Sequence, residues 1–299
     1  MTEVQGVIAA AVTPRGQEGD VDFGATFELI DYLCAAGVRG IALFTAVGEF
    51  PLLALDERSR LLYLAIKRSR VPVLAGVGSA ALDQSVALAR EARDAGAAAL
   101  LVPPPHFFRY RQDEIREFYV QFAARVGTGP VALLSNAPCF TSGLSVETAL
   151  DLLETGRFGG IEDSSGDLQI FSRLQAAAGA FTLLVGSDAL FTRARCDGAA
   201  GAVSSLACAV PELVVALDHA ICAGDSTRVA RLDGMMQEFA AWMDQFPQPV
   251  IVKVATGLRG LKTGPVPVPL PPAKQQRLDE FREWLQGWLP EMKKLSAHA

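Results

Sequence analysis

A run of acids and hydroxyls in the middle of the chain holds the residues best suited to chemistry. The sequence GGIEDSSGD, residues 159–167, sets Glu162 directly after a short apolar stretch. At the mouth of an apolar interior a carboxyl pKa rises above its reference of about 4.3, which makes the group a candidate general acid or base. A pair formed by Glu162 and His106 would serve proton transfer, dehydration or hydrolysis. The alternative is that Glu162 only accepts hydrogen bonds, from Ser135 or from water.

Metal-dependent or nucleophilic chemistry is less well supported by the sequence. The acids and histidine that could hold a divalent ion are Glu49, His106, Glu162, Asp163 and Asp188. An ion held there would act as an electron sink. No recognisable ligand motif joins these residues, so we expect no metal and no other cofactor. Cys139 together with His106 would make a cysteine nucleophile, but a free cysteine is more often an inert core or loop residue.

Eight short apolar runs alternate with helical patterns and must position these groups. The runs occupy residues 6–14, 40–46, 72–78, 98–104, 130–136, 159–163, 181–188 and 201–207. Runs of this length, rich in Val, Ile and Leu, are typical of parallel strands buried on both faces. The stretches between them repeat apolar residues at helical spacing. Eight evenly spaced units predict an α/β fold, a (β/α)8 TIM barrel, in preference to an open doubly wound sheet.

The pattern divides the chain into two parts. Residues 1–225 are predicted to form the barrel, and residues 226–299 to form a helical region packed on it. The proline-rich stretch 264–272 is expected to be an extended connector, because proline lacks an N–H donor and fixes φ. In barrels of this kind the active site lies at the C-terminal ends of the strands.

Composition narrows the partners and the location. A net charge of −6 and a pI near 5.2 argue against nucleic acid or an anionic membrane as the main partner. No apolar run approaches the roughly 20 residues that span a bilayer, and the N-terminus lacks the basic segment of a signal peptide. The five cysteines never form Cys-x-x-Cys, which suits reduced thiols. We therefore expect a cytoplasmic protein whose partner is a small molecule.

The residues at the expected strand ends resemble those of a known family. They read TAVGE at 45–49, SNAP at 135–138, EDSSGD at 162–167, GSD at 186–188 and GAAGAVSSLACAVPE at 198–212. In this order they resemble the dihydrodipicolinate synthase and N-acetylneuraminate lyase family. The resemblance implies a class I aldolase-type lyase or synthase, assembled as a homotetramer or homodimer. It also implies a lysine at the end of the sixth strand that forms an imine with pyruvate, with a tyrosine of the fifth strand as proton relay.

The positions that carry the family's chemistry are changed in this sequence. The imine-forming lysine falls on Glu162 and the relay tyrosine on Ser135. The pair that holds the pyruvate carboxylate falls on Ala46 and Val47, and an arginine common in synthases falls on Phe140. A second relay tyrosine falls at or beside Phe107. With Glu162 and Ser135 at the catalytic positions, the expected substrate-binding residues are Ala46, Val47, His106, Phe107, Asn136, Phe140, Asp188 and Ser204.

Three functions remain open at this point. A carboxylate cannot form an imine, which favours a catalytically silent protein that binds a small molecule or supports an assembly. An enzyme with altered acid–base chemistry centred on Glu162 is the second. The third is a lyase or synthase of pyruvate-type oxo acids that uses another lysine, for which only Lys253 of the six lysines lies near the barrel. An open polar cavity around Glu162 would favour an enzyme or a binder, and a cavity filled by aromatic side chains would favour loss of function.

Overall fold

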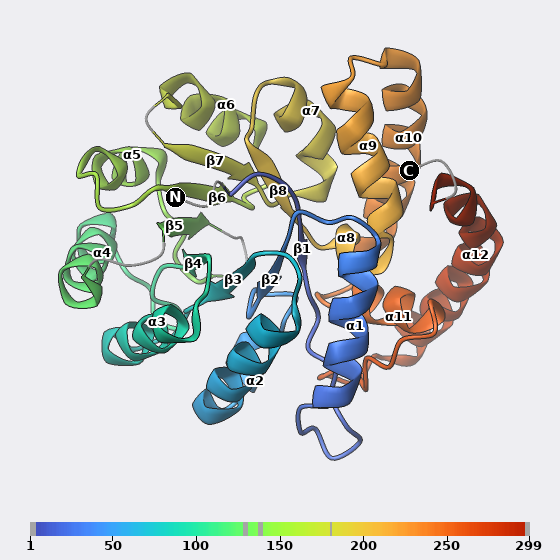
Figure 1. Ribbon diagram of the computed structural model, residues 1–299, viewed down its shortest axis with the longest axis horizontal. Coiled ribbons are helices and arrows are strands. Elements are labelled where there is room, and N and C mark those ends of the chain that lie inside the picture. The colour runs from blue at the N-terminus through green and yellow to red at the C-terminus, as the bar shows by residue number, and fades with distance from the viewer. Residues whose placement is uncertain (1–3, 128–130, 137–139, 180, 297–299) are drawn as a thin grey trace.

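The computed structural model describes residues 4–127, 131–136, 140–179 and 181–296. Eight parallel strands close into a barrel in chain order, with β8 returning to pair with β1 (Figure 1). The strands are β1 (Gly6–Ala10), β2 (Gly40–Leu43), β3 (Val73–Gly76), β4 (Ala99–Val102), β5 (Val131–Asn136), β6 (Gly160–Asp163), β7 (Thr182–Val185) and β8 (Gly201–Ser204). The predicted (β/α)8 barrel is confirmed.

Helices surround the barrel between successive strands. They are α1 (Phe23–Ala35), α2 (Leu55–Arg68), α3 (Leu82–Ala95), α4 (Gln112–Val126), α5 (Val146–Glu154), α6 (Leu168–Ala177), α7 (Phe191–Cys196), α8 (Leu206–Ala209) and α9 (Pro211–Cys222). Two 3-10 turns, η1 (Phe50–Leu52) and η2 (Asp188–Leu190), follow β2 and β7. Several helices begin at a side-chain cap: Asp22, Ser145 and Asp167 each accept a hydrogen bond from an N–H of the first turn.

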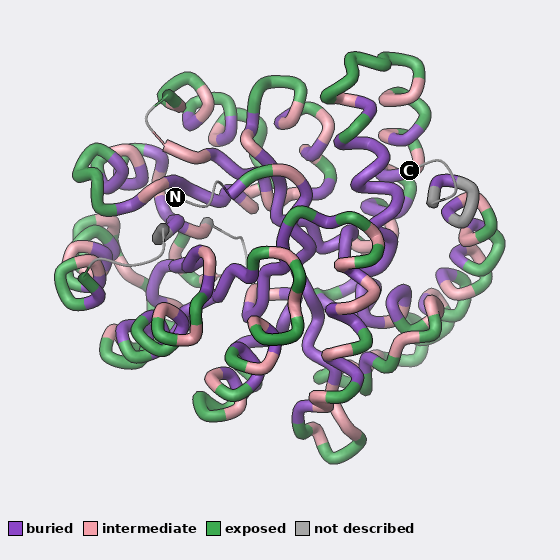
Figure 2. Tube along the Cα trace, in the orientation of Figure 1, coloured by how far each residue is buried: buried purple, intermediate pink, exposed green. Residues whose placement is uncertain are grey.

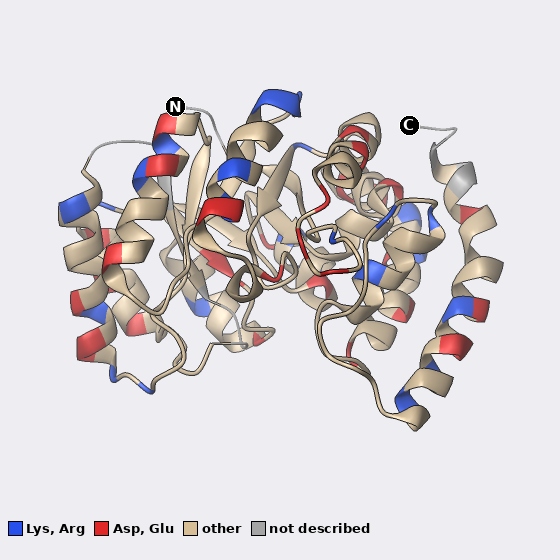
Figure 3. Ribbon diagram, turned by 90° about the horizontal axis from the view of Figure 1, so that it is seen from below, with Lys and Arg blue, Asp and Glu red and all other residues tan. Residues whose placement is uncertain are grey.

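Burial explains the apolar runs of the sequence. Every residue of β2, β3 and β4 is buried, because the helices cover one face of the sheet and the barrel interior takes the other. Figure 2 shows this arrangement, with buried strands at the centre and exposed residues on the outward sides of the helices. Charges of both signs lie on the outer helices (Figure 3), where exposed ion pairs such as Arg116–Asp151 join neighbours.

Three helices follow the barrel and lie together at one side of it in Figure 1. They are α10 (Ser226–Met243), α11 (Val250–Leu258) and α12 (Pro272–Ser296). Phe239 of α10 packs edge-on against Phe281 of α12, with ring centroids 5.9 Å apart, and Trp242 lies 5.8 Å from Trp284. These aromatic contacts fix α12 against α10. Within the described part of the chain, none of the helices combines the length and apolar character needed to cross a bilayer.

Candidate active site

The carboxyl ends of the strands open into a cavity of about 900 Å³. Residues at or just beyond the ends of all eight strands line it, and so do Ala240 and Met243 of α10. Phe50, Phe107 and Phe140 are part of the wall without filling the space. The cavity is therefore open. An open cavity favours an enzyme or a ligand-binding protein over a protein that has lost its site.

Glu162 lies on β6 with its side chain in this cavity. It is 4% exposed and stands in register with Ser135 on β5. The Ser135 hydroxyl donates to Glu162 Oε2 at 2.7 Å, and the Ser164 hydroxyl donates to Oε1. Within the described residues no cation pairs with this carboxylate. In the described part of the site, hydroxyl groups hold both of its oxygens.

Burial dominates the ionisation of Glu162. The loss of water raises the pKa of the carboxyl group to about 7, because the charged form is poorly solvated there. The hydroxyl donors Ser164 and Ser135 oppose this rise, and the neighbouring charge of Asp163 adds to it. At neutral pH the group is present in both protonation states, which is the condition for efficient acid–base catalysis.

The space for this arrangement comes from a glycine at the end of β7. A Cβ atom added at Gly186 would lie 1.8 Å from Glu162 Oε1 and 1.8 Å from the Ser164 hydroxyl oxygen. Any side chain at position 186 would thus displace the Glu162 carboxyl group and the Ser164 hydroxyl. Gly186 belongs to a motif of the family resemblance, but the sequence alone assigns it no role.

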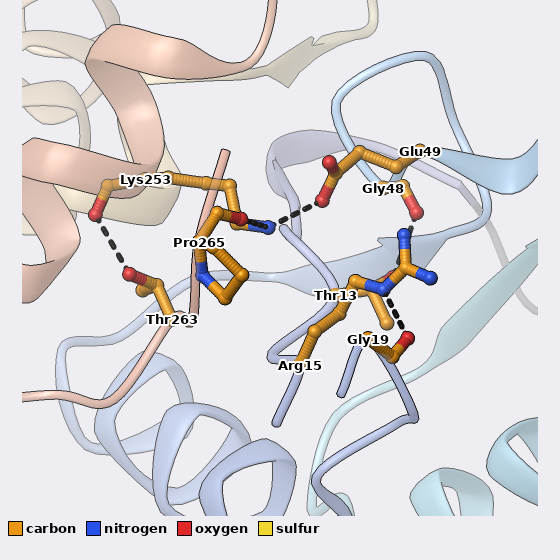
Figure 4. Close-up of polar contacts among 8 residues, drawn as sticks. All are labelled: Thr13, Arg15, Gly19, Gly48, Glu49, Lys253, Thr263 and Pro265. Carbon is orange, nitrogen blue, oxygen red and sulfur yellow. Dashed lines mark hydrogen bonds and ion pairs between the residues drawn. The ribbon is translucent and has the colours of Figure 1, made fainter. Parts of the chain in front are cut away.

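Lys253 does not reach the cavity. Its ammonium group donates to Glu49 Oε2 at 2.6 Å and to the Pro265 carbonyl at 3.0 Å (Figure 4). The side chain is 1% exposed, and the pair joins α11 to the turn after β2. Among the described residues that line the cavity there is no lysine. The hypothesis of Lys253 as an imine-forming residue gains no support from this placement.

The turn after β2 presents a short apolar wall. Ala46 and Val47 line the cavity, as expected, and supply no side-chain donor for a carboxylate. The turn is held between two residues with left-handed backbone, Phe44 at φ 59° and Glu49 at φ 56°. Thr45 also lines the cavity, and its hydroxyl is buried without a hydrogen-bond partner in the described part of the chain.

The loop after β4 forms the aromatic side of the mouth. His106 and Phe107 both line the cavity, as does Phe140. The His106 ring packs edge-on against Phe50, with centroids 5.3 Å apart, and lies 5.9 Å from Phe140. Burial lowers the pKa of His106 and the charge of Arg58 lowers it further, so the imidazole is neutral at pH 7. No hydrogen bond links His106 to Glu162 in the described structure, and the proposed pair is not preassembled.

Asp188 and Ser204 form a second polar group at the ends of β7 and β8. Asp188 lines the cavity, but its oxygens accept hydrogen bonds from the Ser204 hydroxyl and from Leu206 N–H at 3.0 Å. Burial raises the pKa of Asp188 to about 6. Ser204 itself does not line the cavity, whereas its neighbour Ser205 does. These bonds give Asp188 and Ser204 a framework role beside any contact with a ligand.

Some predicted residues cannot be placed and some lining residues were missed. Cys139 and the side chain of Asn136 lie outside the described residues. The sequence assigns no role to Ser164, although its place two residues after Glu162 puts it on the same side of an extended chain. Met243 and Phe246 enter from the end of α10 and the residues after it, and no local pattern connects that segment to the strand ends.

Among the described residues no group of three or more His, Cys, Asp and Glu side chains is arranged to hold a metal ion.

Fold and site together define a barrel protein of the kind that binds a small molecule at the carboxyl ends of its strands. Comparison with known proteins gives the family. The chain belongs to the dihydrodipicolinate synthetase family, whose model matches residues 3–287.

Named relatives and solved structures agree with this assignment. An uncharacterized DapA-like lyase of Halobacterium salinarum is 34% identical, over 89% of this chain and 88% of its own. A 4-hydroxy-tetrahydrodipicolinate synthase of an Azoarcus species is 30% identical, over 90% of this chain and 93% of its own. The crystal structure of dihydrodipicolinate synthase DapA-2 of Bacillus anthracis matches with a TM-score of 0.88 and 26% identity, covering 96% of this chain and 99% of that one. YagE of E. coli K12, solved in complex with pyruvate, matches with a TM-score of 0.86 at 26% identity, covering 95% and 99%.

Proposed function

We propose that this protein is a small-molecule lyase that works without an imine, with Glu162 as its acid–base group. The observation that supports this most directly is a buried carboxyl in an open cavity, with no lysine among the described lining residues. The resemblance puts the family's imine-forming lysine at position 162, and a carboxylate has no amine with which to condense. The names of the relatives favour an enzyme. With an acid at position 162, the chemistry of that enzyme would differ from imine formation.

A dehydration next to a carbonyl group fits one acid–base residue with a pKa near 7. Ionised Glu162 removes a proton from the carbon beside the substrate carbonyl, and the freed electron pair forms a carbon–carbon double bond. The hydroxyl on the next carbon leaves and takes the proton back from Glu162, so that it departs as water. Ser135 and Ser164 hold the carboxylate in one orientation during both transfers.

Exchange in deuterated water tests this proposal without knowledge of the natural substrate. Hydroxylated aldehydes and ketones would be incubated with the protein, and loss of the proton beside the carbonyl followed by NMR. We expect Glu162→Gln to lower the rate by about 10²-fold or more, and Asp244→Asn, at another acid of the lining, to leave most of it. Borohydride treatment with pyruvate should give no covalent adduct by mass measurement. An adduct, or an unchanged rate in Glu162→Gln, would contradict the proposal.

A catalytically silent binding protein is the second candidate, and one observation favours it. Both oxygens of Glu162 already accept hydrogen bonds from serine hydroxyls, so the group can be a fixed acceptor that never exchanges a proton with a ligand. In that case ligands would bind while neither the wild type nor any variant shows exchange.

The family also supports our proposals of a cytoplasmic location and a homotetramer or homodimer. Sedimentation would test the oligomeric state.

A further inference from the structure

The described wall of the cavity offers no lysine or arginine to a ligand. Residues 137–139, outside the described part, are Ala-Pro-Cys. Of the described lining side chains, His106 is the one that can gain a positive charge, and it is neutral at pH 7. A ligand carboxylate entering here would find no ion-pair partner to replace its water.

Acids and hydroxyls line the cavity instead. Glu162, Asp188 and Asp244 are its carboxyl groups. The hydroxyl-bearing residues include Thr45, Ser135, Thr141, Ser164, Ser187 and Ser205. The Thr45 hydroxyl is buried and has no hydrogen-bond partner in the described structure, so a ligand hydroxyl would find a free donor and acceptor there. Carboxylates only accept hydrogen bonds, and they therefore suit hydroxyl donors.

Two buried cations, Arg58 and Lys253, are already engaged by the protein. Arg58 is buried and donates to the carbonyls of Gly76 at 2.8 Å and Gly78 at 2.9 Å. Lys253 is paired with Glu49. Neither residue lines the cavity. Both charges lie behind the lining, and the one N–H group of Arg58 without a hydrogen-bond partner in the described structure, at Nε, is buried there.

We propose that the cavity takes an uncharged polyhydroxylated carbonyl compound, of the aldose or ketose type, and discriminates against carboxylates, including oxo acids. This inference rests on the proposed function, whose dehydration needs a proton on the carbon beside a carbonyl and a hydroxyl on the carbon after it. The phenylalanines of the mouth cover the C–H faces of such a molecule, and the serine and threonine hydroxyls replace the water around its own hydroxyls. Repulsion from Glu162, Asp188 and Asp244 disfavours an anion of the same shape.

A neutral sugar, its aldonate and its amino sugar test the inference. Binding of glucose, gluconate and glucosamine to the wild-type protein would be measured by calorimetry and saturation-transfer NMR at pH 7.5. We expect glucose to bind about tenfold or more tightly than gluconate, since about 1.4 kcal/mol of repulsion suffices for that ratio. Gluconate equal to or tighter than glucose would overturn the inference. So would glucosamine as the tightest ligand, because the site would then select cations.

A charge added to the wall sharpens the test. Phe140→Arg puts a cation in the lining at the position where the resemblance places an arginine, and should tighten gluconate binding about tenfold relative to glucose binding. Val268→Arg, at an exposed position outside the lining, is the matched control and should change neither. Sugar binding without Glu162-dependent exchange would remove the proposed function and leave this inference. If exchange occurs on an oxo acid and depends on Glu162, the proposed function stands and this inference fails.

Discussion

Two buried glutamates of this barrel have opposite surroundings. Glu49 is 3% exposed and is paired at 2.6 Å with the ammonium group of Lys253. Glu162 is 4% exposed, and among the described residues it receives hydrogen bonds only from hydroxyl groups. A buried charge with a matched partner is part of the framework, whereas a buried acid without one is poised to exchange a proton. The difference separates residues that hold the barrel together from residues available for chemistry, and experiments on either glutamate can test it.

The largest effect is expected from breaking the framework pair. Lys253→Met leaves the Glu49 carboxylate buried without a cation, and we expect a loss of about 3–5 kcal/mol in the free energy of unfolding. Urea denaturation would measure it. Lys262→Met, at an exposed lysine of the next loop, is the control and should be near neutral. Adding Glu49→Gln to Lys253→Met should recover part of the loss. If Lys253→Met were as stable as Lys262→Met, the pair would not have the role assigned to it.

The charge of Glu162 should lower the free energy of unfolding, because burial disfavours its ionised form. Its pKa is raised from 4.5 to about 7 in the folded protein. Between these pH values the unfolded chain releases a proton that the folded chain keeps, so the stability contributed by this group falls as pH rises and is lost above pH 7. Relative to wild type, we expect Glu162→Gln to be more stabilising at pH 8 than at pH 5, by about 2 kcal/mol.

Urea denaturation of wild type and Glu162→Gln at both pH values would give this difference. Asp188, whose pKa burial also raises, is present in both proteins, and its contribution therefore cancels. An equal difference at pH 5 and pH 8 would show that Glu162 keeps an ordinary pKa. The assignment of Glu162 as an acid poised to exchange a proton would then fail.

The space around Glu162 gives the next prediction. Gly186→Ala puts a methyl group where the tips of Glu162 and Ser164 lie. Both side chains can swing away, so we expect the fold to survive with a loss of about 1–3 kcal/mol in stability, and Glu162-dependent exchange to fall about tenfold or more. Gly234→Ala in α10, where the new methyl meets open space, should instead stabilise slightly. Unchanged exchange in Gly186→Ala would mean that the position of the Glu162 carboxylate is not critical.

The sequence was sufficient to predict the barrel and the residues at its strand ends. Strands buried on both faces appear as continuous apolar runs, and eight of them with helices between leave few alternatives. The chain order then brings Ser135 and Glu162 to one edge of the barrel, where they are bonded. In a parallel sheet the end of one strand is beside the end of the next, so a local pattern is enough to find such neighbours.

Contacts between distant segments could not be predicted in the same way. The partner of Glu49 is Lys253, 204 residues further along the chain, and no periodicity connects the two. The lining contributed by Met243 depends on how α10 packs against the barrel. The role of Gly186 is also invisible in the sequence, since it consists of the space that a missing side chain leaves to Glu162 and Ser164.

The smallest effect is expected from the hydroxyls that hold Glu162. The Ser135 hydroxyl donates to the carboxylate and so lowers the pKa of Glu162 against the rise caused by burial. Ser135→Ala removes this donor, and we expect the pKa of Glu162 to rise further, by about one unit. The carbon-13 signal of the Glu162 carboxyl, followed through a pH titration, would measure it. Ser187→Ala also changes a cavity hydroxyl, but one without a hydrogen bond to Glu162, and should leave the titration where it was. If both variants moved the midpoint equally, it would depend on the general polarity of the cavity. If only Ser135→Ala moved it, the hydrogen bond from Ser135 would help to set the protonation state of Glu162.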